Sequence, residues 1–173
     1  IHNIIPHEKR FGDRPFANYF VKANDAFVAM SKAVVEQLQT FDPTKPIKCV
    51  PHPIYDNYGE ILPKEEAKQR LNLEINQSYL LFFGFIRDYK GLDLLLDAMQ
   101  DERIQSLGVK LIVAGEFYGN EEKYSEQIEG LGIANQLELR THFIANEEVK
   151  YYFSAADLLV QPYRSATQSG ISQ

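Results

Sequence analysis

Residues 79–99 place an apolar strand, a cationic turn and an amphipathic helix in immediate succession, reading Y-L-L-F-F-G-F-I-R-D-Y-K-G-L-D-L-L-L-D-A-M. The uncharged run up to Gly84 is typical of a strand covered on both faces, as strands in parallel sheets are. The apolar residues after Gly91 recur at i, i+3, i+4 and i+7 and predict one buried helix stripe, formed by Leu92, Leu95, Leu96 and Met99.

The turn between this strand and this helix carries two cations, Arg87 and Lys90. At the carboxyl end of a parallel strand, the backbone N–H groups and the helix dipole favour phosphate-bearing ligands. The turn therefore indicates a nucleotide-diphosphate site. An ordinary strand-to-helix turn with solvated charges explains the same residues equally well.

The rest of the chain alternates strands with helices. Strands are expected at residues 25–30, 46–50, 79–84, 109–115, 136–143 and 157–160. Helices are expected at residues 15–23, 31–39, 63–71, 92–99, 121–131 and 147–156. This alternation predicts an α/β fold, with a Rossmann-like parallel sheet and helices on both faces.

Composition narrows the class of protein. With 173 residues, 45% hydrophobic and 24% charged, the chain has the composition of a globular domain, and it lacks the roughly 20-residue apolar run of a membrane span. A net charge of −6 with scattered basic residues argues against nucleic acid as a partner. The single cysteine, Cys49, fits a reducing, cytoplasmic compartment, and we expect it in a core. No His, Cys, Asp and Glu set has metal-ligand spacing.

Four blocks of sequence together resemble the GT4 family of retaining glycosyltransferases. They are H-N-I-I-P-H-E at 2–8, G-F-I-R-D-Y-K-G-L-D-L-L-L-D-A at 84–98, L-I-V-A-G-E at 111–116 and F-S-A-A-D-L-L-V-Q-P at 153–162. The resemblance implies the GT-B architecture, in which two Rossmann-like domains face each other. It assigns residues 1–54 to the end of the acceptor domain and residues 55–173 to a truncated nucleotide-sugar donor-binding domain, so we expect a fragment of a longer protein.

The resemblance also implies a function. The enzyme would be a hexosyltransferase that moves a sugar from a nucleotide-diphosphate sugar to a glycan or lipid-linked acceptor, with retention of configuration, in polysaccharide biosynthesis. It would need no metal and no cofactor besides its substrate, and the acceptor domain could contact a membrane surface peripherally. Two alternatives stay open, a nucleotide-sugar epimerase of GT-B type and a non-catalytic nucleotide- or sugar-binding module.

The same resemblance assigns the site residues. It gives catalytic roles to His2, which matches the cleft-lining histidine of the acceptor domain, and to Arg87 and Lys90, which would neutralise the departing diphosphate. The arginine that the family carries directly after its first glycine is Phe85 here, and Arg87 stands two places on. The residues assigned to donor binding are Gly84, Gly91, Gly115, Glu116, His142, Ser165, Thr167, Ser169, Gly170 and Gln173.

One departure concerns the end of the chain. Two glutamates that the family directs at the sugar and ribose hydroxyls are replaced by Ser165 and Gln173. Neutral side chains of these types still form hydrogen bonds to hydroxyls. The replacement leaves the identity of the donor open.

Overall fold

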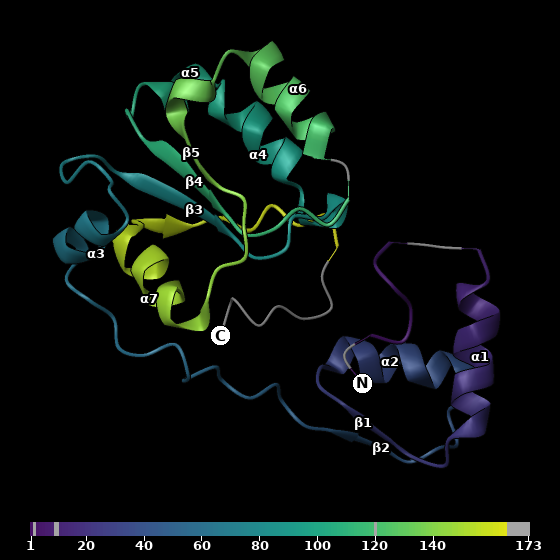
Figure 1. The fold of residues 1–173 in the computed structure, drawn as a ribbon. Helices are drawn as coiled ribbons and strands as arrows, with labels where there is room; N and C mark the ends of the chain where they lie inside the picture. The colour runs from purple at the N-terminus through teal and green to yellow at the C-terminus, as the bar shows by residue number, and fades with distance from the viewer. Residues whose placement is uncertain (2, 9–10, 120, 166–173) are drawn as a thin grey trace. The chain divides into compact units, whose positions relative to one another are not determined.

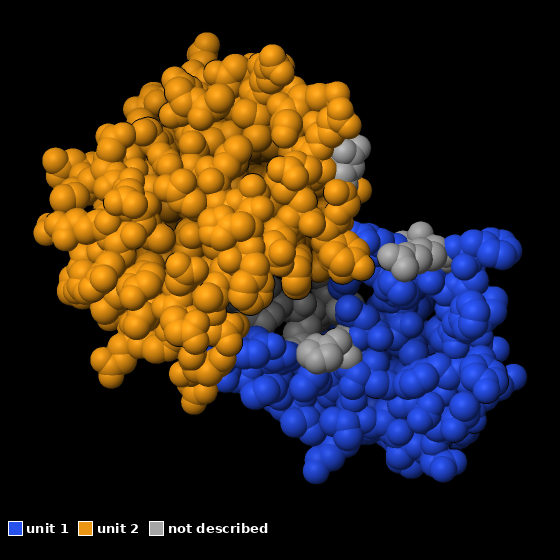
Figure 2. Space-filling model, viewed as in Figure 1, with its two compact units in different colours: residues 1–55, 165–173 blue, residues 56–164 orange. Residues whose placement is uncertain are grey.

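The computed structural model describes residues 1, 3–8, 11–119 and 121–165. The chain divides into two compact units between Tyr55 and Asp56 (Figure 2). The second unit is Asp56–Arg164, and the first is Ile1–Tyr55 together with Ser165. That these units belong to a donor and an acceptor domain stays a prediction.

The second unit is built on a four-stranded parallel sheet with the order β5-β4-β3-β6 (Figure 1). Its strands are β3 (Tyr79–Phe83), β4 (Lys110–Ala114), β5 (Leu137–Arg140) and β6 (Leu158–Leu159). Its helices are α3 (Lys64–Arg70), α4 (Leu92–Met99), α5 (Glu102–Gln105), α6 (Glu121–Leu131) and α7 (Asn146–Ala155). Short 3₁₀ turns lie at Asp88–Lys90 and Ala134–Gln136.

Both faces of this sheet are covered, because successive residues of a strand point to opposite sides. In β3, Phe82 packs with residues of α4 and α6, while Leu81 packs with residues of α3 and α7. Figure 1 shows the two pairs of helices on opposite faces of the sheet. The predicted fold class, an α/β parallel sheet with helices on both faces, is confirmed.

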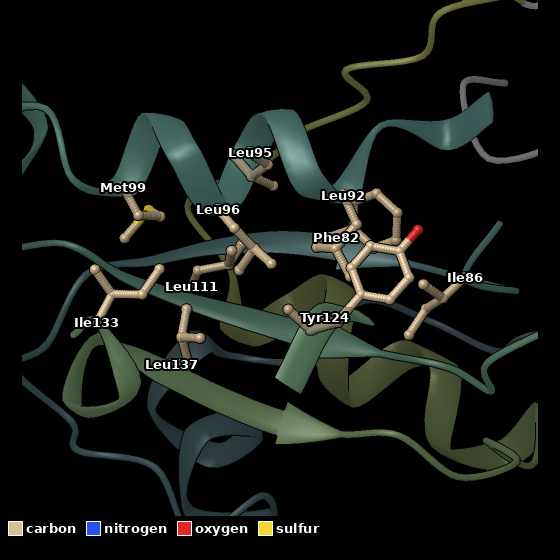
Figure 3. Close-up of a cluster of buried hydrophobic side chains, with 11 residues drawn as sticks. Phe82, Ile86, Leu92, Leu95, Leu96, Met99, Leu111, Tyr124, Ile133 and Leu137 are labelled. Atoms are coloured by element: carbon tan, nitrogen blue, oxygen red, sulfur yellow. The ribbon is translucent and has the colours of Figure 1, made fainter. Parts of the chain in front are cut away.

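Helix α4 presents its predicted stripe to the sheet (Figure 3). All four residues of that stripe are at most 5% exposed, namely Leu92, Leu95, Leu96 and Met99. They meet Phe82 of β3 and Leu111 of β4 in one apolar cluster. This packing fixes the start of α4 relative to the carboxyl ends of the strands.

Within its described residues, the first unit has two strands and two helices. They are α1 (Asp13–Ala23), β1 (Phe27–Ala29), α2 (Lys32–Phe41) and β2 (Ile47–Cys49), and the two strands pair in parallel. Val21, Phe27, Val34 and Leu38 form its core. The expectation that Cys49 is buried is wrong, because β2 pairs only with β1 among the described residues and leaves this side chain exposed.

Two features are absent from the residues that the structure describes. No helix among them is long and apolar enough to cross a membrane. No group of three or more His, Cys, Asp or Glu residues in this part of the chain could hold a metal ion.

Candidate functional site

Two glycines bring the carboxyl ends of β3 and β4 into close contact. Gly84 and Gly115 have φ angles of 96° and 130°, which side chains rarely tolerate. A Cβ atom on Gly115 would lie 2.4 Å from the carbonyl oxygen of Gly84. Glycine is therefore required where the two strands end.

Beyond these glycines the two strand ends stay paired. The Ile86 amide donates to the Glu116 carbonyl at 2.8 Å, and the Tyr118 amide donates to the Ile86 carbonyl at 2.9 Å. Ile86 is buried, and its two neighbours contact the ring of Tyr118. The Phe85 ring lies 6.4 Å from that ring between centroids, and the Arg87 guanidinium lies 3.8 Å from its centroid. Tyr118 thus supports Arg87 at this edge.

Lys90 ends the short turn that precedes α4 and is only 8% exposed. Its ammonium group lies 5.7 Å from the ring centroid of Tyr163 and forms no ion pair or hydrogen bond with any described residue. Burial, and then the charge of Arg87, lower the pKa of Lys90 from 10.5 to about 8. A buried cation without an anionic partner is costly, so an anionic ligand would stabilise this arrangement.

The chain after β6 packs directly against the same turn. Gly91 has a φ angle of 71°, and a Cβ atom there would lie 2.2 Å from the carbonyl oxygen of Pro162. The Tyr89 and Tyr163 rings meet edge to face, with 6.0 Å between centroids. Only glycine at position 91 permits the close approach of the Pro162 carbonyl to the turn.

Charged side chains hold the turn from two directions. Arg164 donates from Nη1 and Nη2 to the two carboxylate oxygens of Asp93 at 2.8 and 2.5 Å, and from Nη1 to the Asp88 carbonyl at 2.8 Å. From α6, Lys123 and Tyr124 donate to the Asp88 carboxylate at 2.8 and 3.2 Å. Hydrogen bonds from Lys123 and Arg164 lower the pKa values of Asp88 and Asp93 respectively, so both carboxylates are ionised at neutral pH.

The result is a cationic edge, which is formed by Arg87 and Lys90 and held by the contacts described above. Arg87 and Lys90 stand where parallel strands end and where α4 begins, so the positive end of the helix dipole adds to their charge. Carboxyl ends of strands in open α/β sheets are also where ligands bind. This arrangement suits a diphosphate group.

The predicted site residues fall into three groups. Gly84, Arg87, Lys90, Gly91, Gly115 and Glu116 lie together at the carboxyl edge of the second unit's sheet, with Glu116 half-buried. His142 is exposed and follows β5 by two residues on the same edge. Ser165 is exposed and belongs to the first unit, where its Oγ lies 3.1 Å from Nδ1 of His7. The predictions for His2, Thr167, Ser169, Gly170 and Gln173 lie outside the described residues.

Sequence reasoning missed several residues whose contacts shape the turn around Arg87 and Lys90. They are Asp88, Asp93, Tyr118, Tyr163 and Arg164. Arg164 and Asp93 are 71 positions apart, and nothing in the sequence pairs them. The aromatic residues near the strand ends were the only signal of these contacts in the sequence. That signal is weak, because aromatic residues are equally common in hydrophobic cores.

Comparisons with known proteins bear on this geometry. A protein from Segniliparus rotundus named D-inositol 3-phosphate glycosyltransferase is 29% identical over 150 residues, which cover 84% of this chain and 33% of that protein. The chain therefore spans about a third of the length of this relative.

Several solved structures have the same fold at low sequence identity. HepE from Anabaena, in complex with UDP and glucose, superposes with a TM-score of 0.79 at 18% identity, over 97% of this chain and 46% of HepE. Sucrose-phosphate synthase from Thermosynechococcus elongatus gives 0.74 at 16% identity, over 94% and 41% of the two chains.

A match to a protein family covers more than half of the chain. Residues 63–172 match the family described as "Glycosyl transferases group 1". The matched range takes in the whole cationic edge, from Gly84 to Arg164. The chain therefore belongs to the group 1 glycosyl transferase family.

Proposed function

We propose that this chain supplies the donor-binding part of a retaining glycosyltransferase, and that the second unit binds the diphosphate of a nucleotide sugar. The full-length enzyme would transfer a hexose to a glycan or lipid-linked acceptor. Membership of the GT4 family, a cytoplasmic location and a role in polysaccharide biosynthesis are parts of the same proposal.

One observation carries this proposal. Lys90 is buried, carries no anionic partner among the described residues and stands beside Arg87 at the start of α4. Two neighbouring like charges repel each other, which a bound anion would relieve. A diphosphate with its two negative groups fits such a pair better than a single carboxylate does.

The chemistry follows from where charge develops. When the bond between sugar and diphosphate breaks, negative charge grows on the leaving phosphate oxygens. Fixed cations aimed at those oxygens stabilise the transition state more than the ground state, and such groups are worth several kcal/mol (about 3–4 for one donor). Arg87 and Lys90 would have this role, with no metal ion required.

The relatives support this choice of substrate. HepE has been solved with UDP and glucose and with UDP-glucose. The Segniliparus relative is named as a glycosyltransferase. A UDP- or GDP-linked hexose is therefore the first class of donor to test.

A turnover assay on the full-length protein tests the proposal. UDP- and GDP-hexoses are offered with glycan and lipid-linked acceptors, and the product is analysed by NMR. We expect acceptor-dependent release of nucleoside diphosphate, a product with the anomeric configuration of the donor, and unchanged turnover in EDTA. Inverted product would refute retention, and loss of turnover in EDTA would refute metal independence.

Two results would replace the proposal by another function. Conversion of the donor sugar to its epimer without an acceptor would identify an epimerase. Tight nucleotide binding with no turnover for any donor and acceptor pair would identify a binding module. Neither alternative is favoured by a feature of the described residues.

A further inference from the structure

We propose that Arg164 is a positioning residue for the donor diphosphate, because it clamps the Lys90 turn to the first turn of α4. The clamp consists of Arg164, the carboxylate of Asp93 and the carbonyl of Asp88. This inference rests on the proposed function of the turn and adds a residue that would not itself contact the ligand.

The contacts of Arg164 bracket the turn from both ends. Its guanidinium spans the Asp88 carbonyl, at the start of the turn, and the Asp93 carboxylate, beyond its end. Its backbone amide donates to the Tyr89 carbonyl at 2.8 Å. Lys90 and Gly91 lie between these attachment points, so Arg164 constrains the path of the chain at Lys90 together with the contacts of Lys123 and Tyr124 to Asp88.

The clamp also controls charge near the ligand. Asp93 lies in the first turn of α4, three residues after Lys90 in the sequence, and an unpaired carboxylate there would repel a phosphate bound at the turn. The bidentate pair with Arg164 neutralises it. Arginine suits this role because its planar fork reaches a carboxylate with two donors, which a lysine ammonium cannot do.

A purely structural role for Arg164 predicts that Arg164→Ala lowers the melting temperature and weakens UDP binding equally with and without Lys90. The positioning role predicts otherwise. The side chains of Arg164 and Asp93 are 42% and 20% exposed, and ion pairs this close to solvent contribute little to stability. Removal of Arg164 should therefore leave the melting temperature nearly unchanged. Its effect should appear in ligand binding, through Lys90.

A double-mutant cycle on the full-length protein tests this route. UDP affinity is measured for the wild type, Arg164→Ala, Lys90→Met and the double variant, with melting temperatures for all four. We expect Arg164→Ala to weaken UDP binding by about tenfold in the wild type and by less than about twofold in the Lys90→Met background, because coupled residues are not additive. Arg164→Lys, which keeps the charge, should recover only part of the loss.

Arg103→Ala is the matched control. Arg103 of the short helix α5 forms a bidentate pair with Asp101, the residue that precedes this helix, at 2.9 and 2.8 Å, and both residues follow the far end of α4 from the turn. Its removal should leave UDP affinity unchanged.

Three results separate the possible failures. Equal weakening by Arg164→Ala in both backgrounds, or full recovery in Arg164→Lys, would overturn the clamp. No weakening by Arg164→Ala while Lys90→Met does weaken UDP binding would overturn the clamp but leave the proposed function standing. Unchanged UDP affinity in Lys90→Met alone would overturn the proposed function of the turn, and the clamp with it.

Discussion

Replacement of Gly91 by alanine should destabilise the protein more than the same replacement at Gly108. Both glycines have a left-handed backbone conformation, with φ angles of 71° at Gly91 and 63° at Gly108. An alanine in this region costs about 1–2 kcal/mol at either position. The surroundings differ, because a Cβ at Gly91 would lie 2.2 Å from the Pro162 carbonyl oxygen, whereas a Cβ at Gly108 would meet nothing within 4 Å.

The extra cost at Gly91 follows from the overlap. Ordinary van der Waals contact begins near 3.4 Å, so the carbonyl of Pro162 or the turn itself must move by about 1 Å. Forced shifts of this kind cost about 1–3 kcal/mol. We therefore expect Gly91→Ala to lower the free energy of unfolding by about 2–5 kcal/mol, against about 1–2 for Gly108→Ala.

Urea unfolding of the two variants of the full-length protein, followed by circular dichroism, measures this difference. Gly91→Ala should also weaken UDP binding, since it displaces the turn that holds Lys90. Equal destabilisation by the two substitutions would refute the close approach of Pro162 to the turn.

Three further predictions concern the same edge. UDP affinity should fall as the pH rises above about 8, because Lys90 then loses its charge in the free protein; a flat calorimetric profile to pH 10 would contradict this. Lys90→Met should stabilise the ligand-free protein at pH 7 by on the order of 1–3 kcal/mol. The lowered pKa of Lys90 means that its charged, buried side chain destabilises the fold below pH 8, and this penalty fades between pH 8 and 10.5. Chemical denaturation of the two proteins checks the sign. Tyr118→Ala should weaken UDP binding by a few-fold, because a cation–π contact worth about 0.5–1 kcal/mol holds Arg87, whereas Tyr55→Ala should have no effect on titration with UDP.

The strand, turn and helix at residues 79–99 could be predicted because local chemistry specifies them. An uncharged apolar run favours a buried strand, and a glycine ends that strand. Leucines at helical spacing then determine which face of α4 is buried. The fold class followed from the same patterns repeated along the chain. Strand lengths were overestimated, as at residues 136–143, where only Leu137–Arg140 form β5.

The environment of the turn could not be predicted, because it depends on which distant segments the sheet brings together. Arg164 reaches Asp93 only because β6 pairs with β3. Tyr118 lies under Arg87 only because the strand ends stay paired beyond their glycines. The prediction for Cys49 is wrong because an apolar neighbourhood in sequence does not reveal that, among the described residues, β2 has a partner strand on one side only.

The central claim is that a nucleoside diphosphate binds at the carboxyl edge of the second unit's sheet through Lys90. Calorimetric titration of the full-length protein with UDP and GDP tests it directly, in the wild type, in Lys90→Glu and in Lys110→Glu, which reverses a charge that pairs with Glu74 at the start of β4. We expect at least one nucleotide to bind the wild type and Lys110→Glu equally, and Lys90→Glu to bind it at least about a hundredfold more weakly, which corresponds to roughly 2.8 kcal/mol. Equal affinity in Lys90→Glu and the wild type would contradict the account.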